Sequence, residues 1–297
     1  MNSNNPYPPE ADIIEPDIIT VVFDAKYYGG YNVKCKGYSD SKVWIKNTTG
    51  GNKGYSYQWY YDSGLTNPIP GQTSDTISGL VAGKYYLRTN DRKSCMKVDS
   101  VIITEPDGMQ LTGSVLSLSP DGNTKISCNG GSDGFIKLNI TGGTTPYTYL
   151  WATDPSTGFT ATIRDIFDLK SGTYESTVTD QNCCILKVMP GSALPRFTLT
   201  EPAALSIAST SSISNDGSFN INCFGGTGSI NITVTGGSVG TYKYNWSTTN
   251  GSGIIDGQED QFALTAGTYK LVVTDLNNCL TAKVITLTPP SVFVAQL

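Results

Sequence analysis

The stretch "TGGTTPYTYLW", from Thr141 to Trp151, places three large aromatic side chains at every second position after two glycines. Alternation with a period of two is typical of a strand that buries one face. The preceding string "FIKLNIT" also puts its apolar residues on one face. The glycine pair supplies the positive φ that a connecting turn needs. We therefore predict a β-hairpin whose two strands both have an apolar inner face.

Similar strings occur three times, with further markers in the same order. A Thr-Gly-Gly triplet followed by alternating aromatics leads to Trp59, Trp151 and Trp246. A Leu-x-x-Gly-x-Tyr string then ends in Tyr85, Tyr174 and Tyr269. An Asp follows each of these tyrosines by six positions, as Asp91, Asp180 and Asp275. The chain is therefore expected to be a series of similar units.

A Glu-Pro pair opens each unit, at Glu15, Glu105 and Glu201. The pairs predict units at 15–104, 105–200 and 201–288, each long enough to bury its own core. Residues 289–297 are expected to begin a further, truncated unit. The rigid proline restricts each joint, because it fixes its own φ and favours an extended residue before it.

Each unit reads as about seven short strands separated by turn signals, and no window has a convincing period of 3.6. We predict an all-β chain of three tandem immunoglobulin-like (PKD-like) antiparallel β-sandwich domains in an elongated rod. In that fold, Trp59, Trp151 and Trp246 are buried on the third strand of each unit. Tyr85, Tyr174 and Tyr269 would form tyrosine corners, in which the phenol bonds back to the backbone.

A specific resemblance rests on one motif string: Cys-x-Gly, a strand, Gly-Gly before Tyr-x-Tyr-x-Trp, Leu-x-Ala-Gly-x-Tyr, and Thr-Asp-x-x-x-Cys. "CNGGSDGFIKLNITGGTTPYTYLW" and "LTAGTYKLVVTDLNNC" carry it most fully, and the chain resembles the SprB repeat family from Glu15 to Pro290. The first unit departs most, because "CKGYSDSKVW" lacks the second glycine. The resemblance implies type IX secretion, display at the cell surface and adhesion during gliding.

Composition excludes several functional classes. The chain has no histidine, which removes Ser-His-Asp and Cys-His catalysis. A formal net charge of −5 argues against a nucleic-acid partner. No stretch of about 18 apolar residues would span a membrane, and the opening "MNSNNPYPPEADIIEP" does not read as a signal peptide. We expect no enzyme and no cofactor.

Seven cysteines occur, and six of them recur in register: Cys35, Cys95, Cys128, Cys184, Cys223 and Cys279. Repeating pairs without histidine predict disulfides in an oxidising compartment. Two pairings remain open, and free buried thiols are a third alternative. Bridges within units would join Cys35–Cys95, Cys128–Cys184 and Cys223–Cys279. Bridges between neighbours would join Cys35–Cys184 and Cys128–Cys279 and leave Cys95 and Cys223 for units outside this chain.

Asp91, Asp180 and Asp275 follow the sixth predicted strand. An Asx-type turn bond is the simpler interpretation of these residues. The alternative is a Ca²⁺ site at a domain junction, where oxygen ligands would gather.

The first repeat contains more tyrosines than the other two, and it also contains Trp44 outside the repeating pattern. If Trp59 and Tyr85 point inward, Tyr60 and Tyr86 point outward on neighbouring strands. Together with Tyr61 and the out-of-register Trp44, they form a candidate ligand-binding platform for sugar rings or a protein.

The sequence therefore predicts a non-catalytic stalk and adhesive segment of a large cell-surface adhesin, outer-membrane associated and acting in gliding and attachment. Its expected partners are surface polysaccharide, neighbouring repeats, and gliding and secretion machinery reached through other parts of the protein. The alternative is a set of carbohydrate-binding or spacer modules of a secreted polysaccharide-degrading enzyme.

Overall fold

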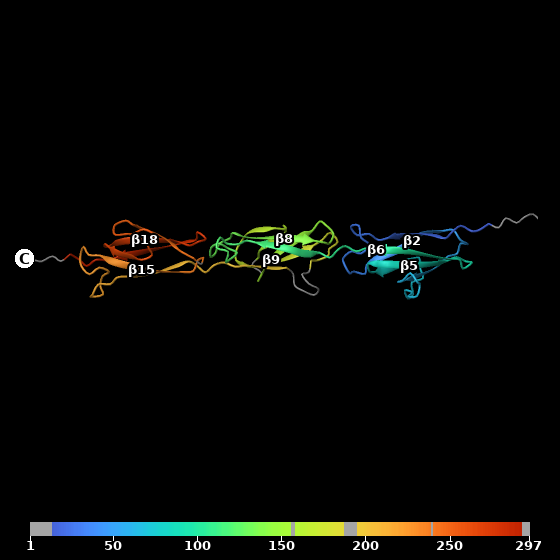
Figure 1. Cartoon of the computed structure of the whole chain (residues 1–297), viewed down its shortest axis with the longest axis horizontal. Coiled ribbons are helices and arrows are strands. Elements are labelled where there is room, and N and C mark those ends of the chain that lie inside the picture. The colour runs from blue at the N-terminus through green and yellow to red at the C-terminus, as the bar shows by residue number, and fades with distance from the viewer. Residues whose placement is uncertain (1–13, 156–157, 187–194, 239, 293–297) are drawn as a thin grey trace, which may run out of the picture. The chain divides into compact units, whose positions relative to one another are not determined.

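The structure is a computed structural model that describes residues 14–155, 158–186, 195–238 and 240–292. These residues form strands and loops with no helix, which confirms the predicted all-β class (Figure 1). The chain divides into two compact units, one of residues 1–110, 140–148 and 178–188, the other of residues 111–139, 149–177 and 189–297. Residues 293–297 of the expected further repeat lie outside the described residues.

Residues 20–103 form two three-stranded antiparallel sheets. One has the order β1-β2-β4 and consists of β1 (Thr20–Ala25), β2 (Ser41–Thr49) and β4 (Thr76–Leu80). The other has the order β3-β5-β6 and consists of β3 (Ser56–Tyr60), β5 (Gly83–Asn90) and β6 (Met96–Ile103). Val43 and Ile77 from one sheet share a buried core with Trp59 and Leu87 from the other. Two sheets in this order, packed face to face, are the immunoglobulin-like arrangement.

The same arrangement recurs at the C-terminal end of the chain. The sheets β14-β15-β17 and β16-β18-β19 consist of β14 (Ser206–Ser211), β15 (Gly228–Thr235), β16 (Lys243–Thr248), β17 (Gln261–Leu264), β18 (Gly267–Thr274) and β19 (Leu280–Leu287). Ile230 and Leu264 of one sheet pack with Trp246 and Leu271 of the other.

Between these two pairs, residues 110–199 supply two further sheets. Their orders are β11-β8-β7 and β10-β9-β12-β13. The strands are β7 (Gln110–Leu116), β8 (Gly134–Thr141), β9 (Thr148–Asp154), β10 (Thr160–Ala161), β11 (Ile166–Leu169), β12 (Gly172–Thr179) and β13 (Arg196–Leu199). Strand β13 pairs with β12 from Gly172–Leu199 to Glu175–Arg196.

The hairpin predicted at Thr141–Trp151 is wrong. Strand β8 lies between β7 and β11, whereas β9 lies between β10 and β12, so the glycine turn carries the chain from one sheet to the other. β2 and β3, and β15 and β16, are divided between sheets in the same way. Alternation fixes which face of a strand is buried, and it leaves open which strand becomes the neighbour.

The turn still needs its glycines. Gly142 and Gly143 have φ of 74° and 68°. A Cβ on Gly142 would lie 2.2 Å from the carbonyl oxygen of Gly108, because the backbone passes directly against the segment that leads into β7. The triplet therefore both turns the chain and admits a second backbone segment.

The recurring aromatics fill the cores as predicted. Trp59, Trp151 and Trp246 are at most 5% exposed. Each indole N–H donates to a backbone carbonyl, those of Ser74, Ile163 and Gln258.

The tyrosine corner is present in all three copies. The hydroxyl groups of Tyr85, Tyr174 and Tyr269 donate to the carbonyl four residues earlier, at 3.0, 2.9 and 2.7 Å. These buried phenols fix the crossing from β4 to β5, from β11 to β12 and from β17 to β18.

Candidate functional site at the linked cysteine loops

A buried aspartate organises the turn that carries the second cysteine of each repeat. Asp275 Oδ1 accepts the backbone N–H groups of Asn277 at 3.0 Å and Cys279 at 2.9 Å. Its Oδ2 accepts the N–H of Ser238, which follows the glycine pair, at 2.8 Å. The aspartate therefore ties the turn before β19 to the turn between β15 and β16.

The other two copies use the same bonds. Asp180 accepts from Asn182, Cys184 and Thr144, and Asp91 accepts from Lys93, Cys95 and Asn52. The bond from the Asn52 N–H holds the pKa of Asp91 well below its usual value. These contacts match the Asx-type interpretation.

Calcium is not favoured at these aspartates, because both oxygens of each carboxylate already accept N–H groups. Among the described residues, no group of three or more His, Cys, Asp or Glu side chains is arranged to hold a metal ion.

Two disulfides join cysteine loops that lie far apart in the sequence. Cys35 bonds to Cys184 with a Cα–Cα distance of 5.8 Å, and Cys128 bonds to Cys279 with 5.6 Å. Both pairs are those of the between-neighbour alternative, and the within-unit alternative is wrong. Each bridge closes about 150 residues, which in the chain-entropy model is worth about 5 kcal/mol.

An asparagine side chain forms a hydrogen bond across each linked pair of loops. Asn182 Nδ2 donates to the carbonyl oxygen of Lys34 at 3.1 Å, and Asn277 Nδ2 donates to that of Ser127 at 3.0 Å. In both cases the accepting residue directly precedes the linked cysteine. The two links are therefore the same structural device, built twice with the same bond.

The Glu-Pro joints contribute a second bond to the loops that carry the first cysteine. Glu105 Oε2 accepts the N–H of Gly37 at 2.6 Å, and Glu201 Oε2 accepts that of Gly130 at 2.8 Å. From the sequence alone, these glutamates were interpreted only as boundary markers. Their recurrence, and the Asp-x-Asn-x-Cys string in two of three units, was the available signal.

Three cysteines are free and exposed, Cys95, Cys183 and Cys223. Cys183 has a φ of 62°, and Ser94 and Asn278 adopt the same left-handed conformation at the matching position of the turn. The extra cysteine therefore occupies a turn position that other small polar residues also fill.

Tyr60 and Tyr86 lie directly opposite each other on β3 and β5, as predicted, but they do not form an exposed aromatic platform. Tyr60 is only 4% exposed, because the segment after β3 folds back, with a bridge from Tyr60 to Pro68. The Arg88 guanidinium covers its ring at 5.5 Å. Trp44 belongs to β2, in the opposite sheet.

The remaining members of the platform are partly accessible. Tyr86 is half-buried beneath Lys84, whose Nζ lies 5.3 Å from the ring centroid. Tyr61 is 51% exposed and lies against the corner residue Tyr85, with ring centroids 6.1 Å apart. Tyr61 therefore packs against the corner residue, whereas Tyr86 lies on the outer face of its sheet, because Tyr85 and Leu87 on either side of it are buried.

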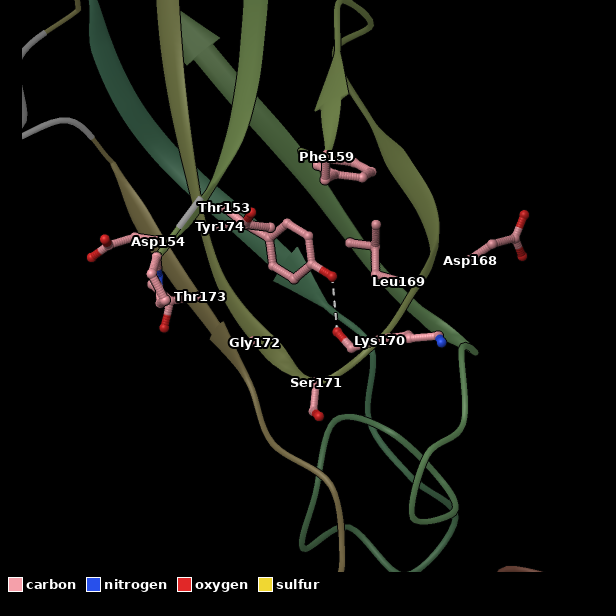
Figure 2. A pocket seen from close by; sticks show the side chains of 11 residues that line it. Thr153, Asp154, Phe159, Asp168, Leu169, Lys170, Ser171, Gly172, Thr173 and Tyr174 are labelled. Carbon is pink, nitrogen blue, oxygen red and sulfur yellow. Dashed lines mark hydrogen bonds between the residues drawn. The ribbon is translucent and has the colours of Figure 1, made fainter. Parts of the chain in front are cut away.

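A cavity of about 460 Å³ lies beside the corner residue Tyr174, between β9 and the turn from β11 to β12 (Figure 2). Figure 2 shows the Tyr174 hydroxyl directed at the Lys170 carbonyl, with Phe159 beside the ring. The Phe159 and Tyr174 rings meet edge to face at 5.4 Å. Asp154, at the rim, is paired with Arg196. The lining also includes a second acid, Asp168, whose carboxylate points away from the Tyr174 ring in Figure 2. The surface beside Tyr174 is therefore mainly aromatic, which suits stacking.

The SprB repeat family matches the chain at residues 124–155 and 216–251. Two segments of this chain therefore match the SprB repeat. Each match contains a Cys-x-Gly loop and the crossover from one sheet to the other, with Trp151 in the first and Trp246 in the second. No curated protein matches the chain. The SprB repeats and the immunoglobulin-like fold fit a repeat segment of the surface-adhesin type.

The solved structures to which this chain aligns include chains of several domains. The three N-terminal domains of the bacteriophage RB49 capsid protein Hoc align at 14% identity and a TM-score of 0.41, over 92% of this chain and all of that one. The eight N-terminal Ig domains of Down syndrome cell adhesion molecule align at 14% identity and 0.32, over 92% and 36%. Bacterial invasin aligns at 14% identity and 0.29, over 91% and 60%. In the described part of the chain, no helix is long and apolar enough to cross a membrane.

Proposed function

We propose that this chain is a non-catalytic segment of a large cell-surface adhesin, in which neighbouring repeats are covalently cross-linked so that the segment bears tension. One observation carries the proposal: the first cysteine of one repeat is bonded to the second cysteine of the following repeat, twice. Disulfides persist in oxidising compartments, which supports an extracellular location.

The domains of this array are residues 15–104, 105–200 and 201–288. Each Glu-Pro joint lies between the last strand of one set and the first strand of the next. Glu105 separates β6 from β7, and Glu201 separates β13 from β14. Because each glutamate also bonds a Cys-x-Gly loop, the joint and the disulfide act on the same loop.

The finer role that we propose rests on the resemblance of two segments to the SprB repeat. The segment acts in gliding motility and attachment to polysaccharide, on an outer-membrane-associated protein exported by the type IX route. Gliding and secretion machinery are engaged by other parts of that protein, and neighbouring repeats are the direct partners of this one.

A second function is favoured by the cavity beside Phe159 and Tyr174, whose aromatic lining could take a sugar ring. In that case the chain is a carbohydrate-binding or spacer array of a secreted polysaccharide-degrading enzyme.

The two functions are separated by immobilising the chain on beads and measuring detachment from polysaccharide-coated glass under flow. The stalk function predicts that C35S/C184S/C128S/C279S chains lose tethers at lower shear than the parent. Phe159→Ala should leave detachment unchanged for a stalk, and should abolish attachment for a binding module. Release of reducing sugar from any polysaccharide would contradict the non-catalytic proposal.

A further inference from the structure

The cavity beside the free Cys95 corresponds to the place beside Cys279 where the linked Cys128 loop lies. It has a volume of about 210 Å³ and is lined by residues 16–19, Gly51 and residues 95–97. Near Cys279, a cavity of about 460 Å³ is lined by Ala204, Leu205 and residues 278–281, and also by Cys128 and Asn129 of the linked loop.

Backbone contacts establish that the two places are equivalent. A Cβ on Gly50 would lie 2.1 Å from the carbonyl oxygen of Ile18, and one on Gly236 would lie 2.0 Å from that of Ala204. Ile18 therefore matches Ala204. Asp91 accepts the Cys95 N–H at 2.9 Å, as Asp275 accepts that of Cys279 at 2.9 Å. The Cys95 turn thus has the linked geometry without a linked partner.

The complementary loop is present around Cys223. The N–H of Gly226 donates to the carbonyl of Cys223 at 2.9 Å, and Gly225 has a φ of 75°. In the linked loop, Gly131 donates to Cys128 at 2.9 Å, and Gly130 has a φ of 71°. The Cys223 loop is therefore already in the conformation that the linked loops adopt.

The free cavity and the free loop each expose a large apolar side chain where the linked places have a small or polar residue. Ile18, which matches Gly108 and Ala204, is 79% exposed, and Phe224, which matches Lys36 and Asn129, is 63% exposed. In the Cys35 link, Lys36 follows the cysteine and lies against Gly108, the residue that matches Ile18. By the same geometry, Phe224 of a bound loop would lie over Ile18 and bury both side chains.

We propose that the cavity at Cys95 receives the Cys223 loop of a second copy of this chain, and that a Cys95–Cys223 disulfide then joins copies head to tail. The oxidant is a small-molecule disulfide such as oxidised glutathione. The Cys223 thiolate attacks it and releases one glutathione thiolate. The Cys95 thiolate then attacks the Cys223 sulfur of the mixed disulfide and releases the second, so two thiols are oxidised while one disulfide is reduced.

The test uses the full chain with C183S, which removes the third exposed thiol. In a glutathione redox buffer this chain should form a ladder of oligomers on a non-reducing gel. With C95S or C223S added separately, each chain should stay monomeric. An equal mixture of the two should give dimers alone, and peptide mapping should find the Cys95–Cys223 bond. Dimers in either variant by itself, or none in the mixture, would overturn the proposal.

Recognition is separated from random oxidation by two matched comparisons. The chain that retains Cys183 together with Cys95 and Cys223 offers a competing exposed thiol. Equal yields of Cys95–Cys183 and Cys95–Cys223 bonds in that chain would show that no recognition exists. Phe224→Asp should slow dimer formation at least tenfold. Phe262→Asp, at a residue of β17 that is 60% exposed and lies outside the loop, should leave the rate unchanged.

A gain-of-function variant tests the same site. The first repeat has Lys93 where the linked turns have Asn182 and Asn277, whose side chains donate to the carbonyl before the partner cysteine. Lys93→Asn restores this donor, so dimer yield at equilibrium should rise about two- to tenfold, as expected for one hydrogen bond. A fall in yield would contradict the proposed docking geometry.

Discussion

The overlap of the two disulfides has a measurable effect on how far the chain can be stretched. The direct route from Cys35 to Cys279 runs 244 positions (279 minus 35). The route through both bridges passes from Cys35 to Cys184, back along the chain to Cys128, and across to Cys279. It contains only the 56 positions between Cys128 and Cys184 (184 minus 128).

Reduction of both bridges should therefore release 188 positions (244 minus 56). At 3.3–3.6 Å per extended residue this is about 620–680 Å of contour length. The assay is single-molecule stretching between tags at the two ends, with contour length measured after all folded segments have been extended. Oxidised and dithiothreitol-treated chains are compared.

Single removals provide the decisive control. With C128S/C279S the route runs from Cys184 directly to Cys279, 95 positions (279 minus 184), so the gain is only 39 positions, or about 130–140 Å. Independent bridges would each release their own closed loop of about 150 positions. A gain near 500 Å from this variant would refute the overlapping arrangement.

Three further changes test the packing around the loops. Tyr174→Phe loses the bond to the Lys170 carbonyl and should lower the free energy of unfolding by about 0.5–1.5 kcal/mol in urea titrations; an unchanged midpoint would show that the corner bond contributes nothing. Because the pKa of Asp91 is lowered in the folded protein, its carboxylate stabilises the fold fully above the unfolded pKa near 3.8, and this stabilisation is lost as pH falls below that value. Asp91→Asn should therefore flatten the dependence of unfolding free energy on pH in acid. An acid transition identical to that of the parent chain would contradict this. Neither CaCl₂ nor EDTA should shift Tm, because both carboxylate oxygens of Asp180 and of Asp275 already accept backbone N–H groups. A Tm shift of several degrees would indicate that calcium binds at these aspartates.

Strand faces and core aromatics were predictable because they depend on local alternation. Trp151 and Tyr174 are buried as expected, and the tyrosine bond follows from the spacing within Leu-x-x-Gly-x-Tyr. Pairing partners were not predictable in the same way. The string around Gly142 reads equally as a hairpin or as a crossover, and only the packing of two sheets decides between them.

The site was predictable in part. The sequence marked all four linked cysteines and left their pairing open, because a choice between near and distant partners depends on how loops of successive repeats meet. The burial of Tyr60 was missed because it depends on the segment reaching Pro68, whose path no period in the sequence describes.

The offset bridges also protect against cleavage. A protease cut between Cys35 and Cys184 is spanned by the first bridge, and a cut between Cys128 and Cys279 is spanned by the second. Every peptide bond from residue 35 to residue 279 is therefore backed by a covalent detour. Exposed loops in this region can therefore be cut once without separating the two parts of the chain.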